Sequence, residues 1–286
     1  VYFLHLIQGL IKDNCYKESI EKNLKDLINS FPQFSILSKW VLDIWTSYII
    51  ENADNKLELD ITKECKWIPK GYERRSTLTV EELNNVLLSD TSEFEKLDLL
   101  SIGIVLQILR MMSEVAASIA NDQCNFNQMW LIHIPSTNNS DTKVKKLAVE
   151  SYKEVEENME IAVSKMLDNK ELIFSDNNKR RKTNDTSDLS LLKKAHVDSH
   201  KLLRKLGKEI GLIIPLNGDN MRMTLSDSLI RFIVLSIVPP ENKMTIDTFL
   251  RKLYEHYGIV IGPREYIQKP AIASDVSFLQ NNLIEF

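Results

Sequence analysis

The feature of this sequence that most restricts its fold is a set of long stretches in which apolar residues recur every third or fourth position. The longest stretch runs from Glu93 to Ala120. This spacing places apolar side chains on one face of an α-helix. Glycine and proline are scarce, with 8 of each in 286 residues, whereas β-sandwiches, propellers and glycine-rich nucleotide-binding folds need many tight turns. The sequence therefore predicts a mainly α protein, an irregular multi-helix bundle.

The same periodicity predicts helices on both sides of this stretch. Residues 1–55 are predicted to be helical with a break at Pro32, and the run Ile36–Ile50 is apolar nearly all round. A helix that is apolar all round is normally buried, so we expect Trp40 and Trp45 to be core side chains. Two amphipathic helices are predicted downstream, over Lys143–Leu167 and Leu189–Ile210.

Two short features refine the prediction for the middle of the chain. Thr79 and Glu82 fit a capping box, in which both side chains bond to backbone amides at a helix N-terminus. A helix is therefore predicted to begin there and to run to Leu88. Gly103 interrupts the long apolar stretch at a cost of about 1 kcal/mol relative to alanine, which indicates a close helix crossing at that position.

Changes in composition divide the chain into three predicted parts. An N-terminal helical domain covers residues 1–135, and long amphipathic helices follow in residues 136–223, interrupted by a polar basic loop at 175–187. Residues 224–286 form a compact C-terminal module. Because the chain begins without methionine and stops in mid-pattern, we expect it to be a piece of a longer protein with a truncated module.

The C-terminal module has the clearest helix signals. Ser226 and Thr245 are suited to cap two helices, and Gly258 is suited to end the second. The apolar triplet Ile259–Ile261 follows and predicts a short strand. A plain helical subdomain and a DNA-binding winged helix both fit this order of elements, and the sequence leaves both open.

Charge and cysteine content restrict the class of protein. The formal net charge is −4, so the chain has no overall cationic field of the kind that nucleic-acid coats carry. Cys15, Cys65 and Cys124 lie far apart, as the reduced thiols of intracellular proteins do. We expect a cytoplasmic protein, or a nuclear one in a eukaryote. The uninterrupted apolar runs are too short to span a bilayer, so no membrane partner is expected.

The sequence has no motif that identifies a common catalytic site: it contains no P-loop, no GxGxxG, no GxSxG and no HExxH. His196 and His200 have the spacing of two zinc ligands, but a zinc site needs a third ligand. They are interpreted as solvent-facing, like the acidic run Glu154–Glu157, and Arg74–Arg75 is interpreted as a surface contact. No catalytic residue, metal or cofactor is therefore predicted.

One segment of the chain is strongly basic. Residues 179–209 contain ten basic and four acidic residues, although the total charge is negative. On its helix, the residues predicted to face inward are Leu191, Leu192, Ala195, Leu202 and Leu206. The basic side chains can contact a phosphate backbone, or can dock on the acidic face Glu150–Glu160 of the preceding helix. The candidate nucleic-acid contacts are Lys179, Arg180, Arg181, Lys182, Lys194, Lys201, Arg204, Lys205 and Lys208.

Three functions are compatible with these features. We favour a non-catalytic helical subunit or scaffold of a larger intracellular complex with protein partners, such as a nucleic-acid-handling or antiviral defence assembly. The alternative is a protein that binds DNA or RNA directly through the C-terminal module and the basic stripe. A second alternative is an enzyme whose active site is assembled from distant helices, and only the abundance of acidic residues supports it.

Overall fold

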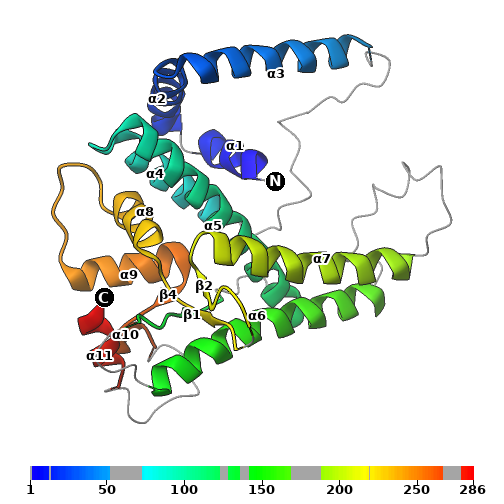
Figure 1. Cartoon of the computed structure of the whole chain (residues 1–286), viewed down its shortest axis with the longest axis vertical. Helices are drawn as coiled ribbons and strands as arrows, with labels where there is room; N and C mark the ends of the chain where they lie inside the picture. Colours follow the sequence, from blue (N-terminus) through cyan, green and yellow to red (C-terminus); the bar gives the residue numbers. More distant parts are fainter. Residues whose placement is uncertain are drawn as a thin grey trace.

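The computed structural model describes residues 2–12, 14–51, 73–122, 128–135, 142–168, 188–218, 220–266 and 278–286. These residues form eleven α-helices, a 3₁₀ turn and four two-residue strands, which confirms the mainly α, multi-helix fold class (Figure 1). The elements in chain order are α1 (Tyr2–Lys12), η1 (Asn14–Tyr16), α2 (Lys17–Asn29), α3 (Pro32–Glu51), α4 (Glu73–Leu88), α5 (Glu93–Ala120), β1 (Trp130–Leu131), α6 (Thr142–Asp168), α7 (Asp188–Glu209), β2 (Ile213–Ile214), β3 (Arg222–Met223), α8 (Asp227–Ile237), α9 (Ile246–Tyr257), β4 (Ile259–Val260), α10 (Pro263–Tyr266) and α11 (Phe278–Glu285).

Several helices begin and end where the sequence predicts. α5 has the predicted limits, and α6 and α7 match the two amphipathic stretches to within a residue at each end. Ser226 accepts a hydrogen bond from the Leu229 N–H, and Thr245 accepts one from the Thr248 N–H, so both residues cap their helices. Gly258 ends α9 with a φ of 64°, a left-handed conformation that is accessible to glycine without steric cost.

α5 is the central helix of the molecule. It packs against α4, α6, α7 and α8. The largest cluster of buried side chains includes Val86, Tyr152 and Phe232, one from each of the three parts predicted from the sequence. The three parts therefore share one core, and the division between them remains a prediction.

Among the described residues, α5 is also the helix that is long and apolar enough to cross a membrane by length and composition. Of its most apolar stretch, 56% is buried inside the protein, by other helices of the same chain. That is the environment of a core helix. The prediction from the sequence was based on uninterrupted apolar runs only, and polar residues such as Glu114 divide α5 into shorter runs of that kind.

Two small sheets connect segments that are distant in sequence. β1 and β4 pair in parallel, with Trp130 opposite Ile259 and Leu131 opposite Val260, while β2 and β3 pair antiparallel. The strand after α9 is thus present as predicted, but its partner lies far upstream in the chain. The described residues after β4 form α10 and α11, and a winged helix stays an open interpretation of the C-terminal module.

The predicted start of α4 is wrong. α4 begins at Glu73, and Thr79 lies inside the helix, where its hydroxyl donates to the Arg75 backbone oxygen at 3.0 Å. Threonine and serine hydroxyls make such bonds one turn back when they occur within a helix. Glu82 does not reach back to an N-terminus either, because its carboxylate bonds to side chains of α5 and α9.

The predicted burial of α3 is also wrong. The segment is a helix, as expected, but Trp40 is 59% exposed, and the side chain of Trp45 lies outside the described residues. α3 packs on α2 near its N-terminal end and extends beyond the helices of the body (Figure 1). A helix that projects in this way keeps its side chains in solvent whatever their polarity.

Gly103 lies at a close helix contact, which confirms the prediction. A Cβ atom at this position would lie 2.4 Å from the ring of Phe232 on α8. The absence of a side chain at Gly103 therefore allows α5 and α8 to pack closely.

Candidate functional site

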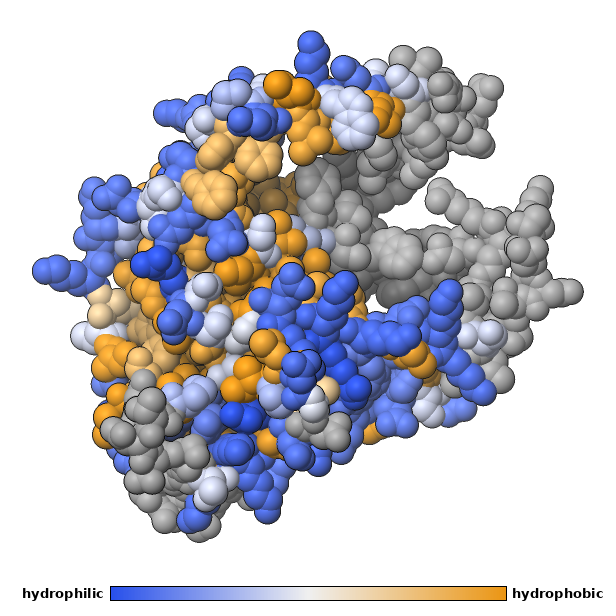
Figure 2. Space-filling model, in the orientation of Figure 1, coloured by the Kyte–Doolittle hydropathy of each residue, from blue (hydrophilic) through white to orange (hydrophobic). Residues whose placement is uncertain are grey.

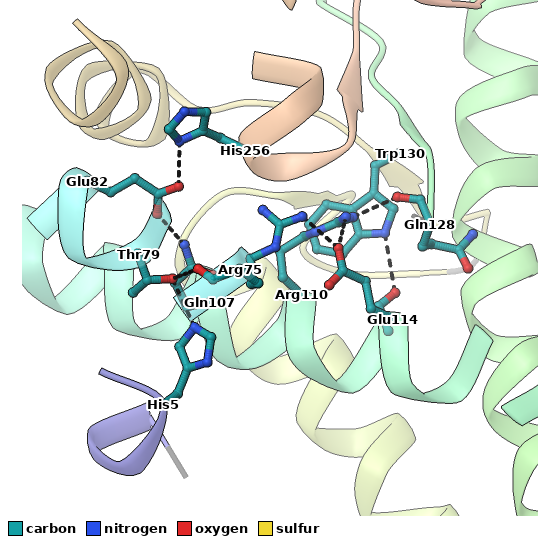
Figure 3. A network of polar contacts seen from close by, with 11 residues as sticks. His5, Arg75, Thr79, Glu82, Gln107, Arg110, Glu114, Gln128, Trp130 and His256 are labelled. Carbon is teal, nitrogen blue, oxygen red and sulfur yellow. Dashed lines mark hydrogen bonds and ion pairs between the residues drawn. The ribbon is translucent and has the colours of Figure 1, made fainter. Parts of the chain in front are cut away.

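The centre of the molecule contains a network of buried polar side chains (Figure 3). Glu114 of α5 accepts a hydrogen bond from Arg75 of α4 at 2.9 Å, and a second from Arg110 on its own helix. Arg110 also donates to the Gln128 backbone oxygen at 2.8 Å, and its guanidinium lies 4.6 Å from the centre of the Trp130 ring. The predicted surface position of Arg75 is wrong, because this side chain is 9% exposed and is paired with a buried carboxylate.

A second carboxylate, Glu82 of α4, connects α5 and α9 to the same region. Gln107 donates to one oxygen of Glu82, and His256 Nδ1 lies 2.8 Å from the other. Thr79 already donates its hydroxyl proton to a backbone oxygen, so its oxygen accepts from His5 Nε2 at 3.0 Å. The network therefore joins α1, α4, α5 and α9 (Figure 3).

Burial alters the titration of two groups at this centre. Burial, with a smaller contribution from Arg75, lowers the pKa of His5 from 6.5 to about 4. His5 is consequently an uncharged imidazole at neutral pH. Burial raises the pKa of Tyr257 well above its usual value, which keeps the phenol protonated.

The cavity beside this network is too small for a substrate. It is lined by Thr79, Glu82 and Gln107 among others, and its volume is about 10 Å³, which is room for about one water molecule. Ligand sites in proteins are larger clefts that open to solvent. We therefore interpret the network as a set of contacts that fixes how the helices pack. The described residues contain no group of three His, Cys, Asp or Glu side chains placed to hold a metal ion.

The basic stripe predicted on α7 is partly used within the chain. Arg204 donates from Nη2 to Glu156 of α6 at 2.8 Å, and its Nε lies 3.2 Å from the Tyr152 hydroxyl. Lys208 donates to the Leu216 backbone oxygen at 2.9 Å. Burial, followed by the hydrogen bond to Glu156, raises the pKa of Tyr152. Arg204 thus makes the contact expected if α7 docks on the acidic face of α6.

The other predicted contacts on α7 are Lys194, Lys201 and Lys205, and all three are exposed. Their spacings of seven and four residues place them in one row along the outer face of the helix. The remaining candidates, Lys179, Arg180, Arg181 and Lys182, lie outside the described residues.

The predicted inward face of α7 is wrong in part. Leu202 is 39% exposed and Ala195 is exposed, while Leu206 is half-buried; the side chains of Leu191 and Leu192 lie outside the described residues. The helix is rotated so that a different set of residues turns inward and packs on α5 and α6. The residues of this set are the buried Leu203, Gly207 and Ile210 and the half-buried His196 and His200. The predicted Leu206 also packs against the core.

The two histidines of α7 are therefore not solvent-facing as predicted. His196 and His200 are half-buried, and their ring centres lie 4.3 Å apart. His200 Nδ1 lies 2.9 Å from the His196 backbone oxygen, the position of a hydrogen bond within the helix.

The most unusual surface of the described structure is on α3. Its large apolar side chains are between 40% and 70% exposed, and Figure 2 shows apolar atoms along this helix at the top of the view. At 100° per residue, six of them fall within an arc of roughly 160° on one side of the helix, which we call the α3 apolar face. Its members are Phe34, Ile36, Leu37, Trp40, Val41 and Ile44.

The apolar surface continues from the base of α3 onto the body. Phe31 packs edge-to-face on Phe34, with ring centres 5.4 Å apart, and on Phe94 at 6.4 Å. Phe94, in the first turn of α5, is itself 73% exposed. Leu42 is also exposed, at 61%, but it lies on the opposite side of α3 from the α3 apolar face.

Sequence reasoning missed the buried ion pairs and the exposure of α3. A signal for the ion pairs was present, because Arg110 and Glu114 stand one turn apart within the apolar stretch of α5. Charged side chains at such positions are buried only when they are paired. No corresponding signal exists for α3, since exposure depends on what surrounds the helix.

Comparisons with protein-family models, with curated proteins and with solved structures give no match. The candidate site therefore depends on the geometry alone, and it consists of two surfaces: the α3 apolar face and the row of three lysines on α7.

Proposed function

We propose that this chain is a non-catalytic helical subunit that assembles with protein through the α3 apolar face. The observation that supports the proposal is the exposure of six large apolar side chains on one side of a single helix. Contiguous apolar patches of that kind mark sites of protein association. A helix that presents apolar side chains at i, i+3, i+4 and i+7 is a common means of binding a complementary surface.

Covering the α3 apolar face would release a substantial hydrophobic free energy. Fully burying a valine, leucine, isoleucine or phenylalanine side chain contributes about 1.5–3 kcal/mol. About half of each side chain in the α3 apolar face is exposed, so covering the six contributes roughly 6 kcal/mol before the entropic cost of association. This free energy is gained only when a partner removes the six side chains from water.

The charge of α3 favours a protein over a membrane surface. Helices that lie on membranes carry lysine and arginine along their polar face. α3 has one basic residue, Lys39, and two acidic residues, Asp43 and Glu51. An anionic bilayer would therefore gain little electrostatic attraction from this helix.

Affinity purification with matched variants tests the proposal. Leu37→Glu places a charge in the α3 apolar face, whereas Leu42→Glu places the same charge at a leucine of similar exposure, 61% against 50%, on the opposite side. We expect proteins, including a differently tagged copy of the chain, to co-purify with the wild type and with L42E but not with L37E. Identical sets of proteins from all three forms would refute the proposal.

The row of lysines on α7 supports nucleic-acid binding as a second candidate function. Lys194, Lys201 and Lys205 are exposed on one face, and lysines that neutralise phosphates supply the electrostatic part of nucleic-acid binding. Their triple replacement by alanine is expected to lower the affinity for nucleic acid and to reduce the slope of log K against log salt by roughly one for each phosphate that is no longer neutralised. Replacement of the exposed Lys17, Lys22 and Lys25 on α2 is the control, and equal effects of the two triple variants would refute this candidate.

A further inference from the structure

We propose that the protein bound by the α3 apolar face is a second copy of this chain, with the two α3 helices antiparallel about a two-fold axis between Trp40 and Val41. The inference rests on the proposed function, because it identifies the partner for the same surface. Closed two-fold pairing is the commonest form of self-association, and it requires that one surface be complementary to itself.

The order of large and small side chains provides that complementarity. With the axis between Trp40 and Val41, each Trp40 lies beside Val41 of the second copy, and each Leu37 lies beside Ile44 of the second copy. The largest side chain thus faces the smallest one of the α3 apolar face, as interdigitating helix surfaces require. In a parallel pair, Trp40 would face Trp40, and the two indole rings would hold the helices apart.

The spacing and length of the helix also suit a pair. Leu37, Trp40 and Ile44 are separated by three and then four residues, the spacing that forms the seam between two packed helices, and Val41, four residues after Leu37, lies on the same face. α3 has 20 residues, which corresponds to about 30 Å. It extends away from the body of the molecule (Figure 1), and none of the other described helices runs along its length.

The charges on α3 permit a copy to approach. Between Pro32 and Ser47 the charged residues are Lys39 and Asp43, which are opposite in sign and lie outside the α3 apolar face. Two copies of this segment therefore meet without net repulsion. A polyanionic partner would instead require several basic side chains on the contact surface, and this segment has one.

The exposed area is close to what a specific dimer needs. Trp40 exposes roughly 150 Å², and the other five side chains of the α3 apolar face expose roughly 50–80 Å² each. Two copies therefore bury roughly 800–1,100 Å² of apolar side chain, near the lower bound of about 1,000 Å² for a specific interface. Phe94, 73% exposed at the base of α3, extends the apolar surface beyond that area.

Solution mass is the first test of self-association. We expect the full chain to have the mass of two copies by light scattering at micromolar concentration and to dissociate on dilution. Val41→Glu puts two like charges at the two-fold axis and is expected to raise the dissociation constant at least tenfold. Leu42→Glu, on the opposite side of α3, is expected to leave it unchanged, and far-ultraviolet circular dichroism checks that both variants retain the wild-type helix content.

Disulfide trapping tests the antiparallel arrangement. In the proposed pair the two residues at position 41 are adjacent, whereas those at position 47 are separated along the axis by roughly 20 Å. A disulfide needs Cα atoms within about 7 Å. We therefore expect Val41→Cys to form a covalent dimer under mild oxidation and Ser47→Cys to form none beyond the wild-type chain treated in parallel. Efficient trapping of both variants indicates a parallel pair and overturns the proposed arrangement.

The outcomes separate this inference from the proposed function. A chain that stays a monomer at all concentrations, yet loses other co-purifying proteins with L37E and not with L42E, overturns the second copy and leaves the proposed function intact. A monomer that co-sediments with phosphatidylcholine vesicles, and no longer does so as L37E, overturns both. Equal weakening of the dimer in V41E and L42E also overturns the inference, because the contact would then not involve the α3 apolar face.

Discussion

Replacing Gly258 by alanine tests whether the buried network fixes the packing of the helices. Gly258 ends α9 with a φ of 64°, and its backbone oxygen accepts the Trp130 N–H of β1 at 2.8 Å. An added Cβ atom would lie 2.5 Å from the Gln128 backbone oxygen and 2.6 Å from Arg110 Nη2. The two groups that it meets are the donor and the acceptor of one buried hydrogen bond.

Two effects determine the expected magnitude. A left-handed conformation costs an alanine roughly 1–2 kcal/mol. Displacing the Arg110 guanidinium weakens a charge-assisted buried hydrogen bond, which contributes about 1.5–3 kcal/mol. The free energy of unfolding should therefore fall by roughly 3–5 kcal/mol, a large share of the total stability of a protein.

Urea-induced unfolding followed by circular dichroism measures this change. The matched control is Gly218→Ala, because Gly218 also has a positive φ, of 93°, but nothing lies within 4 Å of a Cβ atom there. Only the conformational cost applies to this variant, so we expect a loss of about 1–2 kcal/mol. If both variants lose the same stability, the contact of residue 258 with Arg110 does not contribute and the reasoning is refuted.

The buried contacts give three further predictions. Glu114→Gln leaves Arg75 and Arg110 buried without a carboxylate and should lower the free energy of unfolding by roughly 3–5 kcal/mol; a loss below about 1 kcal/mol in urea titrations would contradict the ion pairing. The lowered pKa of His5, about 4 against 6.5, means that the unfolded chain binds the proton first. The contribution of the uncharged His5 to the free energy of unfolding is therefore fully present above pH 6.5, and about 3 kcal/mol of it is lost as the pH drops to about 4. His5→Gln should flatten this pH dependence in unfolding titrations at several pH values. Gly103→Ala should cost about 1–3 kcal/mol by overpacking against Phe232, and thermal unfolding should show partial recovery when Phe232→Leu is added; no recovery would place the strain elsewhere.

The limits of many helices could be predicted from the sequence because they depend on local interactions. The period of apolar residues determines α5 and α6, and hydrogen bonds within a few residues determine the caps at Ser226 and Thr245. The stop at Gly258 likewise depends on the conformational freedom of one residue. These signals act over less than two helical turns, so a single sequence contains them in full.

The functions of individual side chains were harder to predict because their partners are distant in sequence. Thr79 and Glu82 fit a capping box, yet they bond to a backbone oxygen and to side chains that other helices supply. Glu114 receives Arg75 from 39 residues away. A motif is read correctly only when no distant group competes for the same atoms, and sequence spacing does not reveal that competition.

The two candidate surfaces show most clearly which properties depend on the sequence alone and which depend on the tertiary structure. The sequence by itself determined that α3 is an apolar helix and that α7 is a basic amphipathic one. Tertiary structure alone decided that α3 projects into solvent with Trp40 exposed and that Leu203, not Leu202, turns inward on α7. The physical reason is that helical periodicity is a property of the chain, whereas exposure and rotation depend on the surfaces that other helices offer. A helix packs with whichever face finds complementary neighbours, and within the described part of the chain the apolar face of α3 has them only at its base, where Phe34 packs on Phe31.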